Sequence, residues 1–331
     1  MANVSLAEKP LEAPIEAVRP EPRGTAALHR MIFAGLVVVL LVAPFLLYPV
    51  FLMKVLCFAL FASAFNLLLG FGGLMSFGHA AYFGMASYIA AYSAKMWGLT
   101  PELAILLGTL VGTALGLVFG ALAIRRQGIY FSMITLALAQ MIYFFSLQAP
   151  FTGGEDGIQA VPRGYLFGVI NLANDFTLYY VVAAIFLFGL GVIYRIIHSP
   201  FGQVMKAIRD NEPRAISLGY RVNQYKLLIF VLSTALASLA GATKAIVFQL
   251  ASLTDVNWPM SGEVVLMTLV GGLGTVFGPM IGAAVIIAME NYLATFGAWV
   301  LVVQGVIFVV CVLAFREGIV GLIARMTKRS L

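Results

Sequence analysis

Apolar segments long enough, or nearly long enough, to cross a lipid bilayer recur along almost the whole chain. A transmembrane helix needs about 20 such residues. Only 10% of the 331 residues are charged, whereas soluble proteins carry about 25%. The sequence therefore predicts an all-α polytopic membrane protein. The predicted spans cover residues 31–53, 54–71, 76–97, 102–124, 128–148, 178–197, 226–251 and 297–316.

A further apolar region, 262–293, is interrupted by glycine and proline. The interrupting residues are Gly271, Gly272, Gly274, Gly278 and Pro279. We expect either two short spans or a re-entrant pair of half-helices, and both alternatives return the chain to the same side. With this region, the predicted count is about 8–10 transmembrane helices.

The basic residues predict the orientation of these helices. If the N-terminus is cytoplasmic, all but four of the 20 basic residues lie in cytoplasmic segments. Three of the four, Lys54, Lys95 and Arg163, lie in outer segments, and Lys244 lies inside a span. Lysine and arginine are enriched in cytoplasmic loops. We therefore expect both termini in the cytoplasm.

Residues 1–30 differ from the rest of the chain in being rich in proline and in charges of both signs. This composition is typical of a disordered segment. The apolar run that begins at Met31 lacks a small-residue cleavage site, so we interpret it as the first membrane helix. The predicted organisation is a disordered cytoplasmic tail (1–30), a transmembrane domain (31–320) and a cytoplasmic C-terminal tail (321–331).

The long connection 198–225 predicts two short amphipathic helices on the cytoplasmic side. Ser199 can cap the first helix, and Pro200 suits its first turn. Asp210-Asn211 separates the helices, and Gly219 ends the second. Four apolar residues fall on one face at helical spacing: Phe201, Val204, Met205 and Ile208.

These helices have two possible roles. They could rest on the lipid surface as an interfacial element, or they could form a docking platform for a cytosolic partner. The charged cluster at their junction favours the platform, because a helix that rests on lipid needs no such turn. The predicted contact residues are Ala207, Ile208, Arg209, Asp210, Asn211, Glu212 and Gly219.

Two glycine-rich segments, 72–78 and 271–278, resemble each other. Paired breaks of this kind mark the substrate path in many transporters. Polar side chains next to the first break should avoid lipid and face other helices or a water-filled path. An interhelical hydrogen bond is the alternative for each of them alone. The candidate path residues are Asn66, Gly72, Gly73, Ser76, His79, Lys244, Gly271, Gly272 and Gly274.

Lys244 is the one charged residue well inside a predicted span. Three alternatives remain open for it. Its side chain could reach the outer surface, face the translocation path, or pair with an acidic group such as Glu290.

The sequence contains no Gly-x-x-x-x-Gly-Lys-Ser/Thr phosphate loop, so any ATP hydrolysis must come from another polypeptide. Cys57, Cys311 and the three histidines are too scattered for a metal cluster. We therefore expect no catalytic residue, metal or cofactor in this chain. No nucleic-acid partner is expected.

Residues 31–320 resemble the permease subunits of bacterial branched-chain amino acid ABC importers, specifically the second of their two paralogous permeases. The resemblance rests on four segments in the expected order: 66–81, 152–158, 199–219 and 269–275. It implies a type II ABC importer fold in the bacterial inner membrane. It also implies that residues 207–212 are the coupling helix that seats in an ATPase groove.

The implied assembly contains a paralogous permease, two cytosolic ATPase subunits that bind ATP and Mg²⁺, and a periplasmic solute-binding protein. We expect the binding protein near 149–165 and 251–262. The first of these regions contains the predicted periplasmic loop residues Thr152, Gly153, Gly154 and Asp156.

The leading functional hypothesis is import of amino acids, especially branched-chain ones, by alternating access. Urea, amides and other amino acids are alternative substrates. A self-sufficient secondary transporter or channel would need carboxylates in mid-span, but Glu102, Glu263 and Glu290 lie near predicted outer ends. An intramembrane enzyme would need a catalytic pair. The closeness of Ser76 and His79 is more simply structural.

Overall fold

The computed structural model describes residues 24–168 and 170–293, together with residues 302, 303, 305, 306, 309 and 318. The predicted disorder of residues 1–23, most of the predicted span 297–316 and the predicted tail 321–331 lie outside this part of the chain. Residues 24–30, which we expected to belong to the disordered tail, instead form the first turns of a helix.

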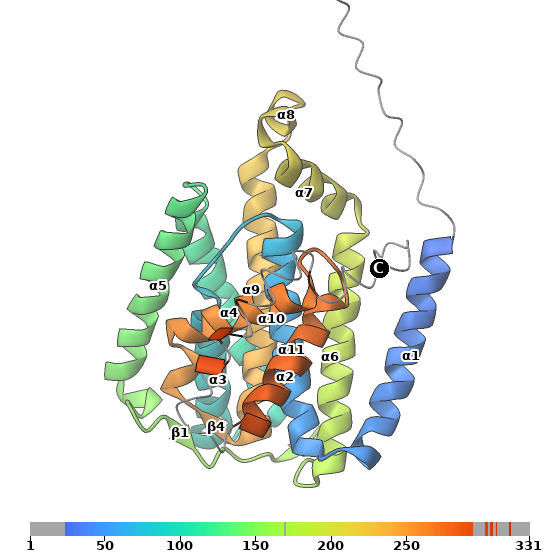
Figure 1. Ribbon diagram of the computed structural model, residues 1–331. Coiled ribbons are helices and arrows are strands. Elements are labelled where there is room, and N and C mark those ends of the chain that lie inside the picture. The colour runs from blue at the N-terminus through green and yellow to red at the C-terminus, as the bar shows by residue number, and fades with distance from the viewer. Residues whose placement is uncertain are drawn as a thin grey trace, which may run out of the picture.

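The described part is almost entirely helical (Figure 1). The α-helices are α1 Gly24–Leu46, α2 Pro49–Asn66, α3 His79–Met96, α4 Pro101–Ala123, α5 Ile129–Gln148, α6 Asp175–Ile197, α7 Pro200–Asp210, α8 Glu212–Ser217, α9 Val222–Phe248, α10 Trp258–Gly271 and α11 Gly278–Leu293. Shorter elements are the π-helix η1 Leu67–Phe71, the 3₁₀-helices η2 Pro150–Thr152 and η3 Leu253–Asp255, and the strands β1 Ile158–Gln159, β2 Tyr165–Leu166, β3 Ile170–Asn171 and β4 Leu250–Ala251.

Proline sets the start of several helices. Pro49, Pro101 and Pro200 each occupy the first turn of a helix, where a missing N–H costs no hydrogen bond. The break that we predicted between residues 53 and 54 therefore lies at Tyr48–Pro49 instead. Lys54, predicted in an outer connection, lies inside α2.

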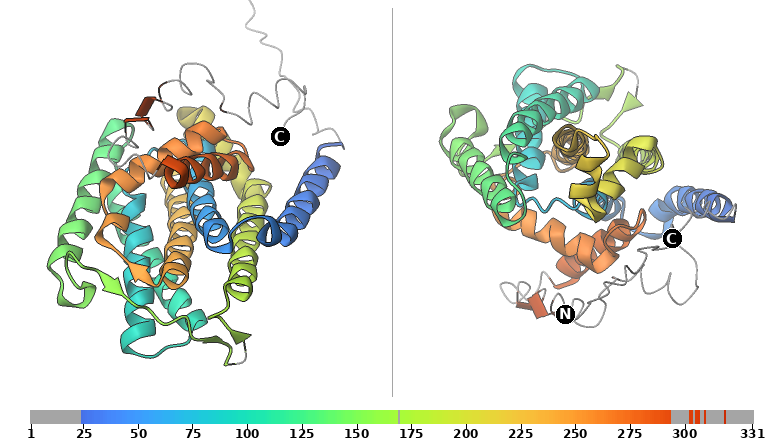
Figure 2. Two further views of the ribbon diagram at one scale, coloured as in Figure 1. Left: turned by 60° about the horizontal axis from the view of Figure 1, so that its bottom comes forward. Right: turned by 90° about the horizontal axis from the view of Figure 1, so that it is seen from above.

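Helix α9 lies at the centre of the bundle, in contact with α2, α3 and α4 (Figure 1). Helices α10 and α11 cover α2, and α6 packs on another side of α2. Helix α1 lies at the edge, where it contacts α2 and α6 (Figure 2). Seen from above, α7 and α8 lie over the bundle (Figure 2).

A stripe of glycines on α4 permits its close approach to α9. A β-carbon at Gly112 would lie 2.7 Å from Ser238 Cβ, and one at Gly116 would lie 2.7 Å from Thr234 Cβ. Small residues let membrane helices approach closely and gain van der Waals contact, because lipid provides no hydrophobic driving force for association. The sequence analysis did not single out this stripe.

Five described helices are long and apolar enough to cross a membrane, namely α2 with η1, α4, α5, α6 and α9. The all-α polytopic prediction is thus confirmed. The predicted count of 8–10 is larger because it also includes shorter or less apolar helices and the span 297–316. Among the shorter ones, α10 and α11 have 14 and 16 residues. At 1.5 Å per residue they extend about 21 and 24 Å, less than the ~30 Å hydrocarbon core.

Two opposite ends of the molecule differ in structure. The strands mark one, which we call the hairpin end: β1 pairs antiparallel with β4, and β2 pairs antiparallel with β3. Lys95 Nζ donates to Gln159 O there at 2.7 Å. The opposite end, which we call the α7–α8 end, contains the α4–α5 loop, where Gln127 Nε2 donates to Glu212 Oε1 at 2.9 Å.

Candidate coupling and translocation site

At the first predicted break, α2 widens into a π-helical turn. The α-helix runs to Asn66, and η1 continues through Phe71. Such π-helical turns are rare in proteins overall, and those that occur often lie at functional sites. A β-carbon at Gly70 would lie 2.6 Å from the Gly274 nitrogen. Glycine at this position therefore lets the backbone of η1 contact the turn between α10 and α11.

The side chain of Asn66, the last residue of α2, bonds to the second glycine-rich segment. Its Nδ2 donates to Thr275 O at 2.8 Å, and its Oδ1 accepts from the Gly274 N–H at 3.0 Å. Asn66 is 2% exposed, so water cannot replace these bonds. We call Asn66, Gly70–Gly73 and Gly271–Thr275 the glycine junction. The residues just before the first glycine-rich segment are thus in direct contact with the second segment, and the lining of a substrate path by these segments stays a prediction.

Arg209 connects the glycine junction to α7. Its Nη1 donates to Gly70 O at 2.6 Å, while its Nη2 contacts Asp210 Oδ1 at 2.9 Å. Gly73 has a φ of +68°, and a β-carbon there would lie 2.7 Å from Arg209 Cγ. The alkyl part of Arg209 thus packs on Gly73. These contacts hold α7 against η1 and the glycine that follows it.

The predicted path residues Ser76 and His79 are both fully buried. Ser76 Oγ accepts from the Gly78 N–H at 3.2 Å. His79 Nε2 lies 2.9 Å from Ser233 Oγ, and that hydroxyl donates to Ala64 O. Because the hydroxyl proton is already used, His79 Nε2–H is the donor to Ser233. In this conformation His79 ties α3 to α9 by an interhelical hydrogen bond, which was the alternative to a path role.

Lys244 forms a buried ion pair. Its Nζ lies 2.6 Å from Asp255 Oδ2, and the two side chains are only 10% and 4% exposed. Asp255 also accepts from the Ser252 N–H and hydroxyl. Pairing with an acidic group is therefore confirmed, whereas a place for Lys244 on the translocation path stays a prediction. The example that we gave, Glu290, is wrong: this residue pairs with Lys54 at 3.4 Å.

The predicted helix pair at the α7–α8 end is confirmed, including its caps. Ser199 Oγ accepts from the Gly202 N–H, and Asn211 Oδ1 accepts from the Arg214 N–H. Gly219, just after α8, has a φ of +86°. Among the predicted contact residues Ile208 is buried and Glu212 is half-buried, whereas the others are exposed: Ala207, Arg209, Asp210, Asn211 and Gly219.

Glu212 is fixed to the body of the bundle. Its Oε2 lies 2.7 Å from Lys226 Nζ, and the Lys226 side chain is only 7% exposed. Nearby, Ile216 and Leu218 are 58% and 70% exposed. These two residues were not among the predicted contact residues. The only sequence signal for a contact role was that these two apolar residues lie close to a charged turn.

At the hairpin end, the structure brings together the two regions predicted to meet a binding protein. Ile158 of β1 pairs with Ala251 of β4. Thr152 is buried, and its hydroxyl donates to Ser146 O at 2.6 Å. The other predicted loop residues form the turns next to it: Gly153 and Gly154 have positive φ, and Asp156 is exposed.

Within residues 24–168 and 170–293, no three His, Cys, Asp or Glu side chains are grouped so that they could hold a metal ion. The geometry instead combines broken membrane helices with a helix pair that contacts them from one end. These features define a polytopic membrane protein whose broken helices are contacted at one end by a pair of short amphipathic helices.

Comparison with known proteins identifies the family. The family described as "Branched-chain amino acid transport system / permease component" matches residues 47–312. Because this match covers most of the chain, the protein belongs to that family. The predicted resemblance is thereby confirmed.

Individual relatives carry different names. The chain is 24% identical over 277 residues to the high-affinity branched-chain amino acid transport system permease protein LivM of Salmonella typhimurium, covering 77% of this chain and 65% of the relative. It is 29% identical over 242 residues to the ribose import permease protein RbsC of Bacillus subtilis, covering 66% and 70%. The chain thus spans slightly less than two thirds of the LivM length. No solved structure matches it.

Proposed function

We propose that this chain is a permease subunit of an ATP-driven importer that moves amino acids, specifically branched-chain ones, into the cytoplasm. The observation that carries the proposal is the hydrogen bond between Arg209 and Gly70 O. It joins the exposed helix pair at one end to the broken membrane helices in the interior. The similarity to the LivM permeases supports the choice of substrate.

In this proposal the α7–α8 end faces the cytoplasm and receives an ATPase subunit. Exposed Ile216 and Leu218 would enter an apolar groove of the ATPase, and the charged turn at Asp210 would set the orientation. The Glu212–Lys226 ion pair would transmit force to the central helix α9. A second permease and a second ATPase subunit would complete the membrane assembly.

The proposed coupling runs from α7 through Arg209 to η1, and from η1 through Asn66 to the turn between α10 and α11. Each step is a hydrogen bond of 2.6–3.0 Å. Packed elements with two discrete arrangements can transmit such a displacement. Closure of the ATPase subunits would thus move both broken segments of the glycine junction together.

At the hairpin end, a periplasmic solute-binding protein would deliver the substrate. The paired strands β1 and β4 and the start of α10 would form its contact surface. This arrangement places substrate delivery and ATPase docking at opposite ends, as alternating access requires.

A second candidate substrate class is pentose sugars. The relative named as a ribose import permease has the higher identity, 29% against 24%, although its match covers less of this chain. A sugar lacks the ammonium and carboxylate of an amino acid, so the two substrates need different polar partners in the path.

Co-purification followed by transport tests the proposal. The chain is extracted from its own membrane in mild detergent, and the partners are identified by mass spectrometry. We expect a second permease and two ATPase subunits. Vesicles containing that assembly and its cognate binding protein should take up labelled leucine when ATP is supplied. Uptake of ribose but not of leucine would identify the transported substrate as a sugar. A homo-oligomer without ATPase partners would instead support a self-sufficient transporter.

A further inference from the structure

Three charged side chains of both signs meet where α2, α10 and α11 pack together. Lys54 Nζ of α2 lies 3.4 Å from Glu290 Oε2 of α11, and the Glu290 carboxyl shares a hydrogen bond with the carboxyl of Glu263 in α10. Figure 1 shows the start of α2 and the end of α11 at the same end of the bundle as β1 and β4. We call Lys54, Glu263 and Glu290 the hairpin-end cluster.

The hairpin-end cluster is accessible from outside the chain. The side chains of Lys54 and Glu290 are 34% and 24% exposed, and Glu263 is half-buried. Helix α2 is nonetheless one of the helices long and apolar enough to cross a membrane. Charged groups on such helices are costly against acyl chains and face a water-filled space or another protein element instead. The exposed side of the cluster therefore faces water or another subunit.

The chemistry of the hairpin-end cluster matches a ligand that carries both signs of charge. Ionised carboxylates only accept hydrogen bonds, so Glu263 and Glu290 need a donor between them, and an ammonium group offers three. Next to this pair, Lys54 Nζ offers donors to an anionic group. A simple cation or anion would satisfy only one half of the cluster. An amino acid carries its ammonium and its carboxylate on the same carbon atom and fits both halves.

The hairpin-end cluster lies just inside the surface at which we propose substrate delivery. Glu263 is five residues after Trp258, the first residue of α10, which is about 7.5 Å at the helical rise. Glu290 is three residues before Leu293, the last residue of α11, or about 4.5 Å. A solute that enters from the hairpin end thus meets these charges within the first two helical turns.

We propose that the hairpin-end cluster is the entry site for the zwitterionic head of the transported amino acid, an inference that rests on the proposed function. The substrate ammonium would donate to both Glu263 and Glu290, and the substrate carboxylate would accept from Lys54. Each charged group of the cluster then has a partner of opposite sign. A sugar has neither charged group, so this site would discriminate between the two candidate substrate classes.

Photo-crosslinking of a leucine analogue tests the proposal. The purified assembly, without its binding protein, is irradiated with photo-leucine, which carries a diazirine in its side chain and an unchanged zwitterionic head. Labelled residues are mapped by mass spectrometry. We expect labelling on α2, α10 and α11 around the hairpin-end cluster, and competition by leucine. Labelling confined to other helices would overturn the proposal.

Competitors that lack one charge test the zwitterion itself. The compound 3-methylbutylamine has the ammonium without the carboxylate, and 4-methylpentanoate has the carboxylate without the ammonium. Each should compete about tenfold or more less well than leucine, because each loses a hydrogen bond between charged groups. Competition by either compound as strong as that by leucine would show that one charge suffices, and the proposal would be wrong.

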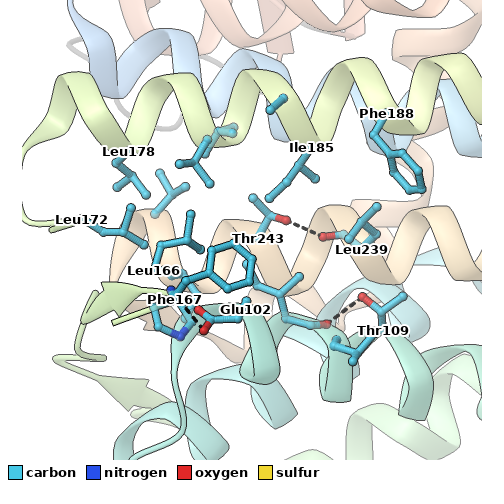
Figure 3. Close-up of a pocket in the computed structure, with 18 residues that line it drawn as sticks. Glu102, Thr109, Leu166, Phe167, Leu172, Leu178, Ile185, Phe188, Leu239 and Thr243 are labelled. Atoms are coloured by element: carbon cyan, nitrogen blue, oxygen red, sulfur yellow. Dashed lines mark hydrogen bonds between the residues drawn. The ribbon is translucent and has the colours of Figure 1, made fainter. Parts of the chain in front are cut away.

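Variants without one charge have matched controls at the same end of the molecule. Glu263→Gln and Lys54→Gln should each lower the labelling about tenfold. Glu102→Gln and Lys95→Gln should leave it unchanged. Glu102 lies on α4, where it accepts from the Phe167 N–H of the β2–β3 hairpin (Figure 3), and Lys95 is exposed near the end of α3. An equal loss in all four variants would contradict a specific role for the cluster.

A charge-swapped variant separates recognition from stability. Lys54→Glu combined with Glu290→Lys keeps an ion pair between α2 and α11, so the unfolding temperature should stay near that of the unmodified chain. Labelling should still fall about tenfold, because Glu263 then faces a lysine instead of a second carboxyl. Full labelling of the swapped variant would show that the ion pair serves only the fold.

Uptake distinguishes failure of this proposal from failure of the proposed function. In vesicles with ATP and the binding protein, Glu263→Gln should lower leucine uptake about tenfold relative to the unmodified assembly. If the unmodified assembly takes up leucine and the variant matches it, the entry site alone is refuted. If the unmodified assembly takes up ribose and no leucine, the proposed function is refuted together with the entry site.

Discussion

At the residue scale, Asn66 acts as a substitute for backbone pairing, because its amide satisfies one N–H and one carbonyl of the α10–α11 turn. We expect Asn66→Leu to lower the free energy of unfolding by about 1–3 kcal/mol, because the half-buried Gly274 N–H and Thr275 carbonyl lose their partner. Uptake should fall as well. Thermal unfolding and transport by the reconstituted assembly measure the two effects. The control is Asn223→Leu, at an exposed position of α9. If the two variants were equally stable and transported equally well, Asn66 would not be required to pair with the α10–α11 turn.

The buried pair of Lys244 and Asp255 leads to a second prediction at this scale. Lys244→Met leaves a carboxylate unpaired in a nearly dry site, and breaking a buried pair in this way costs about 3–5 kcal/mol. Lys244→Met combined with Asp255→Asn should recover much of the loss. A double-mutant cycle of unfolding free energies measures the coupling. Additive effects would show that the two side chains do not stabilise each other.

Arg209 provides the third residue-scale prediction. Arg209→Ala removes the hydrogen bond to Gly70 O, so transport should fall at least about tenfold while the assembly still hydrolyses ATP, since such a bond to a charged donor is worth about 1.5–3 kcal/mol. Parallel assays of uptake and ATPase activity test this separation. Gln203→Ala, an exposed position on the same helix, should leave both activities unchanged. Full transport by the Arg209 variant would remove this residue from the coupling route.

At the element scale, the contact of α4 with α9 depends on side-chain size. Gly112→Leu places a β-carbon 2.7 Å from Ser238 Cβ, so the helices must separate. Overpacking of this kind costs about 1–3 kcal/mol or more. We expect a lower unfolding temperature and less folded protein in the membrane. Ala114→Leu, at an exposed position of the same helix, should be tolerated. If both variants were equally stable, the glycine stripe would not be required for packing.

At the scale of the whole molecule, the proposed function places the two ends on opposite sides of the membrane. Leu218 is 70% exposed at the α7–α8 end, and Asp156 is exposed at the hairpin end. In intact cells a membrane-impermeant thiol reagent should label Asp156→Cys, and Leu218→Cys only after the cytoplasm is opened. A variant without Cys57 and Cys311 serves as the background. Labelling of Leu218→Cys in intact cells would invert the proposed orientation.

Much of the local structure was predictable because it depends on neighbouring residues. Ser199, Pro200 and Asn211 set the boundaries of α7 and α8 as expected. Apolar length set the positions of α4, α5 and α6 to within a few residues. The first loop was misplaced because Pro49 determines the break more strongly than the charge of Lys54.

By itself the sequence determined that this protein is an all-α polytopic membrane protein, because its long apolar segments can satisfy every backbone group within a membrane helix. The permease assignment came from the four segments that resemble a known family. Only the tertiary structure decided which residues far apart in the sequence come into contact. Asn66 and Gly274 are 208 residues apart in the sequence, and no local pattern encodes their contact. The same holds for the contact of Gly70 with Arg209. Such contacts depend on how the helices pack together, and residue spacing along one helix cannot specify that packing.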